Sequence, residues 1–199
     1  MPSRVREKLT KEQKRDRILE TAGRLFRQYG FAKTTVADIA GELGMSPANV
    51  YKFFPAKDAI VEASANRNLA LIREAVDAVA RSKASAAARI EKIALTIFRF
   101  HQELFRNEQH IFQMVTQAVE ESWQCIFDYE AYLCETLETM VTEGMAGGEF
   151  KRGQPGRLRL PLFDALYVAL HPHLRHTWTP EEKEHRVRAH VAFVISALK

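Results

Sequence analysis

Residues 35–54, TVADIAGELGMSPANVYKFF, constrain the fold more than any other stretch of the chain. Thr35 stands where it can cap a helix, and Asp38, three residues later, can complete a capping box with it. Ile39 belongs to an apolar helix face, and Gly44 can supply the positive φ of a tight turn. The pattern predicts a short helix that ends in a sharp reversal.

A second helix is predicted directly after this turn. Ser46 is a good N-cap, and Pro47 suits the first helical position because its missing N–H would have no partner there. Val50 and Phe53 are expected to point toward the core. The exposed side of this helix then carries Ala48, Asn49 and Lys52. Two short helices joined in this way form a helix-turn-helix, whose second helix can enter the major groove of DNA.

Charge is distributed unevenly along the chain. Residues 1–57 hold 12 Lys and Arg against 6 Asp and Glu, whereas residues 58–199 hold 17 against 19. The positive charge therefore lies beside the predicted helix-turn-helix, where phosphate binding would need it.

The segments ILETAGRLFRQYGF, TTVADIAGELGMSPANVYKFF and AKDAIVEA follow one another between Ile18 and Val61. Ile18, Ala22, Leu25, Phe26 and Tyr29 recur there at helical spacing, and Gly30 is expected to end that helix. In this order the segments resemble the DNA-binding head of TetR-family transcriptional repressors. The resemblance covers residues 11–71 and implies a DNA-binding domain there, followed by a ligand-binding and dimerisation domain over residues 72–199.

Two kinds of DNA contact are expected. Tyr51 and Lys57, with Thr35 and Lys52 in support, are predicted to contact phosphates. Base readout is predicted for the exposed side of the second helix, at Ser46, Pro47, Ala48 and Asn49. Asn49 is the favoured residue, because its amide can pair bidentately with adenine. Its side chain could instead return to the backbone of the Ser46 cap.

Beyond residue 57 the pattern is helical almost throughout, so the predicted class is all-α. Helices are expected at about 57–81, 85–106, 109–120, 122–146, 159–175 and 180–198. A long loop is expected between Gly147 and Gly156, where glycine is concentrated.

The last two predicted helices are candidates for a dimer interface. Residues 160–170 are apolar nearly all round, and such a helix must be buried on every side. The resemblance implies a four-helix interface with a second subunit. The final helix offers Val187, Val191, Val194, Ile195 and Leu198 for this contact. A homodimer is also expected because two heads can read a palindromic operator.

The central helices are rich in aromatic residues, including Phe100, Tyr129 and Tyr132. Most are expected to be core, but some can line an apolar pocket, and the resemblance implies an inducer site in this region. The candidate ligand-binding residues are Phe98, His101, Phe105, Phe112, Gln113, Gln117, Trp123, Phe127, Phe163 and Tyr167.

Other classes of function find little support in the sequence. There is no Gly-x-Ser-x-Gly elbow, His-Glu-x-x-His, P-loop or dinucleotide turn, so no enzyme is predicted and no cofactor is expected. His171, His173 and His176 could be read as a metal cluster, but Pro172 and the helical spacing argue against a shared ion. No metal site is predicted.

No membrane helix is expected, because no apolar run is long enough. Cys125 and Cys134, nine residues apart on one helix, cannot bridge each other and suit a reducing cytoplasm. The sequence predicts a dimeric repressor that a small hydrophobic inducer releases from its operator. The alternative is a DNA-binding protein of the same fold that a protein partner controls, or one without a small-molecule effector.

Overall fold

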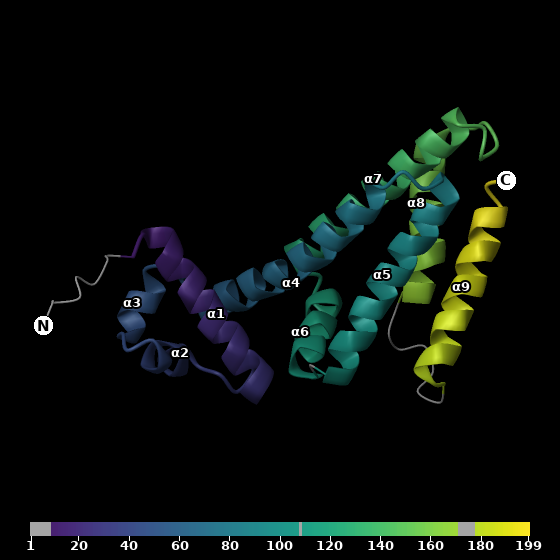
Figure 1. The fold of residues 1–199 in the computed structure, drawn as a ribbon. Coiled ribbons are helices and arrows are strands. Elements are labelled where there is room, and N and C mark those ends of the chain that lie inside the picture. The colour runs from purple at the N-terminus through teal and green to yellow at the C-terminus, as the bar shows by residue number, and fades with distance from the viewer. Residues whose placement is uncertain (1–8, 108, 171–177) are drawn as a thin grey trace, which may run out of the picture.

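The computed structural model describes residues 9–107, 109–170 and 178–199. All regular secondary structure in these ranges is α-helix. The helices are α1 (Lys11–Tyr29), α2 (Val36–Glu42), α3 (Pro47–Tyr51), α4 (Lys57–Ala80), α5 (Ala86–Asn107), α6 (Gln109–Glu120), α7 (Gln124–Ala146), α8 (Pro155–Leu170) and α9 (Pro180–Ser196). Figure 1 shows a small head of α1–α3, with α4 running from the head into a larger helical body. The predicted all-α class is confirmed.

The head is held by a small apolar core. Ile18 and Phe26 of α1 pack with Ile39 of α2 and Val50 of α3, and all four are fully buried. Phe54 completes this core, and Phe53, the residue expected to point inward, is partly buried and packs against it.

The end of α1 differs slightly from expectation. Gly30 does end the helix, with a φ of 84° and an N–H that donates to the Phe26 carbonyl. Tyr29, expected on the apolar face, is instead 52% exposed.

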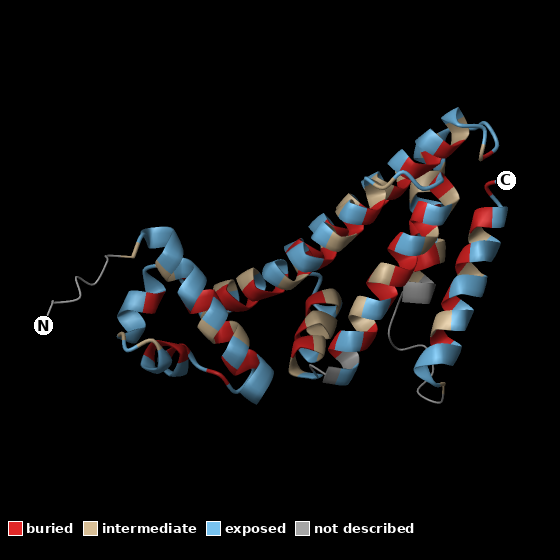
Figure 2. Cartoon of the chain, viewed as in Figure 1, coloured by how far each residue is buried: buried red, intermediate tan, exposed pale blue. Residues whose placement is uncertain are grey.

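The body is organised around α5, which contacts α4, α6, α7, α8 and α9. Figure 2 shows buried positions running along the inner sides of these helices and exposed positions on their outer sides. The buried inner residues of α5 include Ile90, Ile93, Ile97 and Phe98. A surrounded central helix therefore forms the core of the body.

Helix α8 begins earlier than expected, at Pro155 rather than at residue 159. Proline suits the start of a helix because its fixed φ is already helical. The predicted glycine-rich loop is shortened accordingly, to residues 147–154. Phe150 in this loop is buried against Gly144 of α7, and the Lys151 N–H donates to the Leu198 carbonyl at 2.8 Å.

The last two helices pack against each other and against α5. Four residues proposed for the dimer contact are buried within the single chain instead: Val187, Val191, Ile195 and Leu198. Val194 is half-buried. The expectation that these four side chains contact a partner was wrong, because α5 and α8 already cover the inner face of α9. Among the described side chains of these two helices, the exposed large apolar ones are Leu160 (57% exposed) and Phe193 (75% exposed).

Other expectations concern the body as a whole. Cys125 and Cys134 are buried and free. Within the described ranges no helix is long and apolar enough to cross a membrane. His171, His173 and His176 lie outside the described residues. Among the residues that are described, no group of three or more His, Cys, Asp or Glu side chains could hold a metal ion.

Candidate DNA-binding surface and ligand cavity

The helix-turn-helix is built by local contacts that follow from its sequence. The Asp38 N–H donates to Thr35 Oγ1 at 3.1 Å, and the Thr35 N–H donates to Asp38 Oδ2 at 2.8 Å. This capping box fixes the start of α2, and hydrogen bonding to Thr35 lowers the pKa of the Asp38 carboxyl. Gly44 has a φ of 64°, which lets the chain reverse into α3.

The four residues predicted to read bases lie together and exposed at the start of α3: Ser46, Pro47, Ala48 and Asn49. The Ser46 side chain makes no cap hydrogen bond, so its hydroxyl can face DNA. Lys52 Nζ donates to Asn49 Oδ1 at 3.1 Å. The Asn49 amide is thus bonded to an exposed lysine and not to the Ser46 backbone.

The predicted phosphate contacts have different surroundings. Tyr51 is 49% exposed. Lys57 is half-buried at the start of α4, and its Nζ donates to the Ala32 carbonyl at 3.2 Å. Thr35 Oγ1 donates to Asp38 Oδ2 at 2.7 Å, so a phosphate would compete with a carboxylate for that hydroxyl. Tyr51 and Lys52 are therefore the most accessible of the four.

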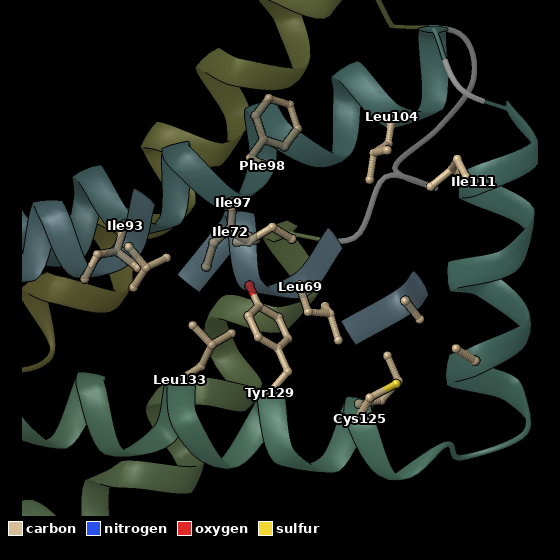
Figure 3. Packing of buried hydrophobic residues seen from close by; sticks show 14 of the residues in the cluster. Leu69, Ile72, Ile93, Ile97, Phe98, Leu104, Ile111, Cys125, Tyr129 and Leu133 are labelled. Carbon is tan, nitrogen blue, oxygen red and sulfur yellow. The ribbon is translucent and has the colours of Figure 1, made fainter. Parts of the chain in front are cut away.

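A cavity of about 220 Å³ lies in the body, between α4, α5, α6, α7 and α8. Figure 3 shows part of its wall, with Leu69 of α4, Ile97 of α5, and Tyr129 and Leu133 of α7 converging. The full lining is predominantly aliphatic and aromatic: Leu69, Ile97, His101, Leu104, Phe112, Val115, Thr116, Val119, Glu120, Ile126, Tyr129, Glu130, Leu133, Phe163 and Tyr167. Such a concave apolar site with a few polar groups is typical of small-molecule binding.

Four of the candidate ligand residues line this cavity: His101, Phe112, Phe163 and Tyr167. The Phe163 and Tyr167 rings lie with their centroids 5.6 Å apart.

Of the other candidates, those with described side chains do not line the cavity. Phe98 is buried in the core, whereas Gln113 and Phe127 are exposed. Gln117 Nε2 and Trp123 Nε1 both donate to the Glu121 carboxylate, at 2.7 and 2.9 Å. The Phe105 side chain is outside the described residues.

Sequence reasoning missed three polar residues of the cavity. Thr116, Glu120 and Glu130 line it, and none was among the candidates. Thr116 Oγ1 donates to the Phe112 carbonyl, which is an ordinary contact within a helix. Aromatic content had pointed to this region, but the packing of α6 and α7 against their neighbours decides that Glu120 and Glu130 line the cavity.

Two family descriptions match the chain. Residues 18–64 match the family described as "Bacterial regulatory proteins, tetR family". Residues 86–191, more than half of the chain, match "Tetracyclin repressor-like, C-terminal domain". The chain belongs to the TetR family. It is therefore a DNA-binding transcriptional regulator, and the head described above is its TetR-type DNA-binding domain.

A curated relative is similar to the chain over a short stretch. "Uncharacterized HTH-type transcriptional regulator YerO" of Bacillus subtilis is 43% identical over 49 residues, which make up 25% of this chain. The chain spans only 17% of the length of that relative.

Solved structures share the whole fold. A putative transcriptional regulator from Saccharomonospora viridis, in complex with choline, has a TM-score of 0.66 and 22% identity, covering 94% of this chain and 97% of its own. RolR in complex with resorcinol has a TM-score of 0.63 and 16% identity, covering 94% of this chain and 88% of its own. At these identities the likeness concerns the fold.

Proposed function

We propose that this TetR-family regulator is a dimeric repressor, and that a small ligand entering the body cavity releases it from its operator. The observation that carries the proposal is the position of α6. This helix contributes Phe112, Thr116 and Glu120 to the cavity, and it also contacts α1 of the DNA-binding head. A ligand in the cavity therefore touches a helix that supports the head.

The contact between α6 and the head is close. A Cβ added to Gly30, at the end of α1, would lie 3.2 Å from Nδ1 of His110, in the first turn of α6. A shift of α6 is thus transmitted to α1 by steric contact. The ligand lowers operator affinity by the ratio of its affinities for the two arrangements of the head, and a ligand without such a preference has no effect.

Two structures of the same fold support a small-molecule effector, because one holds choline and the other holds resorcinol. The cavity volume of about 220 Å³ is below the range of roughly 300–1,000 Å³ typical of drug-sized ligands. A small ligand fits as the structure stands.

The dimer is proposed to form through the exposed faces of α8 and α9, which carry Leu160 and Phe193. A contiguous exposed apolar patch is a typical mark of an interface, and Leu160 and Phe193 are the candidate members of such a patch on these two helices. Phe193→Glu should give monomers by light scattering, with little loss of stability. Leu71→Glu, at a 52% exposed apolar position on α4, is the matched control and should stay dimeric. If Phe193→Glu and Leu71→Glu both stay dimeric, the interface lies elsewhere.

The repressor mechanism is tested by selecting an operator from a random DNA library and measuring binding by fluorescence anisotropy. We expect the wild-type dimer to bind the selected operator, and a ligand that raises its melting temperature to lower operator affinity. In vitro transcription from a promoter overlapping the operator should fall when the protein is added. A rise in transcription would indicate an activator.

The alternative is control by a protein partner. Thermal shift against a library of small lipophilic compounds distinguishes the two, since a ligand that binds only the folded protein stabilises it by RT ln(1 + L/Kd), where L is the free ligand concentration, and so raises its melting temperature. An operator-binding dimer that responds to no compound would favour a protein partner.

A further inference from the structure

Among the described residues that line the cavity, those that are charged are acidic. Glu120 and Glu130 contribute carboxylates, and no lysine or arginine is among the described residues that line the cavity. His101 is the one lining side chain in the described ranges that can become cationic near neutral pH. Glu120 is exposed, whereas Glu130 of α7 is half-buried.

Glu130 is in an unfavourable environment for a carboxylate. Burial raises the pKa of its carboxyl, and the nearby charge of Asp164 on α8 raises this pKa further. No cation from the described part of the chain offsets these effects. Desolvation of a charged group without a partner is costly, so a positive group brought into the cavity would stabilise the carboxylate.

A second polar group of the cavity also has no partner. The Tyr129 hydroxyl is buried and makes no hydrogen bond, and the residue is 7% exposed. Figure 3 shows its hydroxyl end among Leu69, Ile72, Ile97 and Leu133. A buried hydroxyl usually has a hydrogen-bond partner, and this one belongs to a side chain that lines the cavity, so a ligand can supply the missing group.

The apolar part of the lining suits a cation with a hydrophobic body. Phe112, Phe163 and Tyr167 bring aromatic rings to the cavity, and ring faces attract ammonium groups. Leu69, Leu133 and their neighbours offer no hydrogen bonds and favour apolar groups. An anion of the same size would face two carboxylates and no described lysine or arginine.

We propose that the ligand of this cavity is a small organic cation, with an amine or quaternary ammonium group beside Glu130 and an apolar or aromatic body among the surrounding side chains. The assignment rests on the proposed role of the cavity as the effector site and adds the chemical class of the effector. Glu130 supplies the charge preference, and Glu120, which is exposed, adds a weaker attraction.

Three probes of closely similar shape test this assignment on the full-length protein. Phenyltrimethylammonium is cationic, tert-butylbenzene is its neutral carbon isostere, and benzenesulfonate is anionic. Binding is measured by thermal shift and by calorimetry. We expect the cation to bind at least about tenfold more tightly than the neutral isostere, because the carboxylate and the ring faces both favour charge. The anion should bind more weakly than either.

Glu130→Gln keeps the shape of the side chain and removes its charge. We expect it to weaken binding of the cation about tenfold or more and to change binding of the isostere less than about twofold. Glu135→Gln is the matched control, since Glu135 is exposed on the same helix and does not line the cavity. It should leave all three affinities unchanged.

Equal affinities for the cation and the isostere, or a cation affinity that Glu130→Gln does not change, would overturn the assignment while leaving ligand control intact. An operator-binding protein that none of the three probes stabilises would overturn it too. A protein that binds the cation through Glu130 but keeps its operator affinity would support the assignment and argue against ligand-induced release.

Discussion

Asn49→Ala separates DNA recognition from stability at a single residue. In the free protein the Asn49 side chain is exposed, and its Oδ1 accepts a hydrogen bond from Lys52 Nζ at 3.1 Å. Loss of an exposed contact of this kind costs no more than about 0.5 kcal/mol. The helix propensity of alanine is about 0.5 kcal/mol more favourable than that of asparagine, which offsets the lost hydrogen bond. The backbone bond from the Asn49 N–H to the Ser46 carbonyl is kept.

The melting temperature of this variant should therefore stay within a few degrees of wild type. DNA recognition should change much more. Loss of a bidentate contact to adenine costs about 1–3 kcal/mol, which is roughly 5-fold to 150-fold in Kd. The loss should be confined to one base pair in each half-site. Anisotropy titrations against the selected operator and its single-base-pair variants measure this directly.

Lys52→Ala is the control, because it removes the same hydrogen bond from the other side. If Asn49 acts only by positioning Lys52, both variants should weaken binding to all sequences and lower its salt dependence. If Asn49 reads a base, only Asn49→Ala should lose discrimination at one position. An Asn49→Ala protein with an unchanged operator profile would refute base readout at this residue.

Three further predictions concern other parts of the chain. Lys57→Ala should weaken binding to all DNA sequences alike and reduce the salt slope by about one phosphate contact, as measured by anisotropy at several salt concentrations; a changed sequence preference would contradict this role. Gly144→Ala should lower the free energy of unfolding by about 1–3 kcal/mol in urea titrations, because the added Cβ would lie 2.3 Å from the Phe150 ring; an unchanged midpoint would contradict the tight packing. Glu184 accepts hydrogen bonds from Arg99 and Arg188, and the Arg99 contact above all lowers its pKa from 4.5 to about 2. Because the folded-state pKa is depressed, this stabilisation is present above about pH 4.5 and is lost as the pH falls toward 2. In thermal melts Glu184→Gln should therefore cost no more than about 1 kcal/mol at pH 7, since the arginines are exposed, and the difference from wild type should shrink in acid.

The sequence by itself determined the parts of this protein that depend on neighbouring residues. The capping pair Thr35 and Asp38, the positive φ at Gly44 and the proline at the start of α3 are all local features, and the structure has each of them. Residue type and spacing decide such features, because the interacting groups are three or four residues apart. The all-α class follows in the same way from helical periodicity over long segments.

Only the tertiary structure decided which face of each body helix meets which neighbour. Val187 and Val191 were equally suitable for a dimer contact or for the core, and the packing of α9 on α5 and α8 assigned them to the core. Phe127 and Phe163 are both aromatic, yet one is exposed and the other lines the cavity. Glu130 gained its significance from burial beside Asp164, a residue 34 positions away that α8 brings close. A helical pattern fixes spacing within an element, but the neighbours of a buried side chain depend on how separate helices pack.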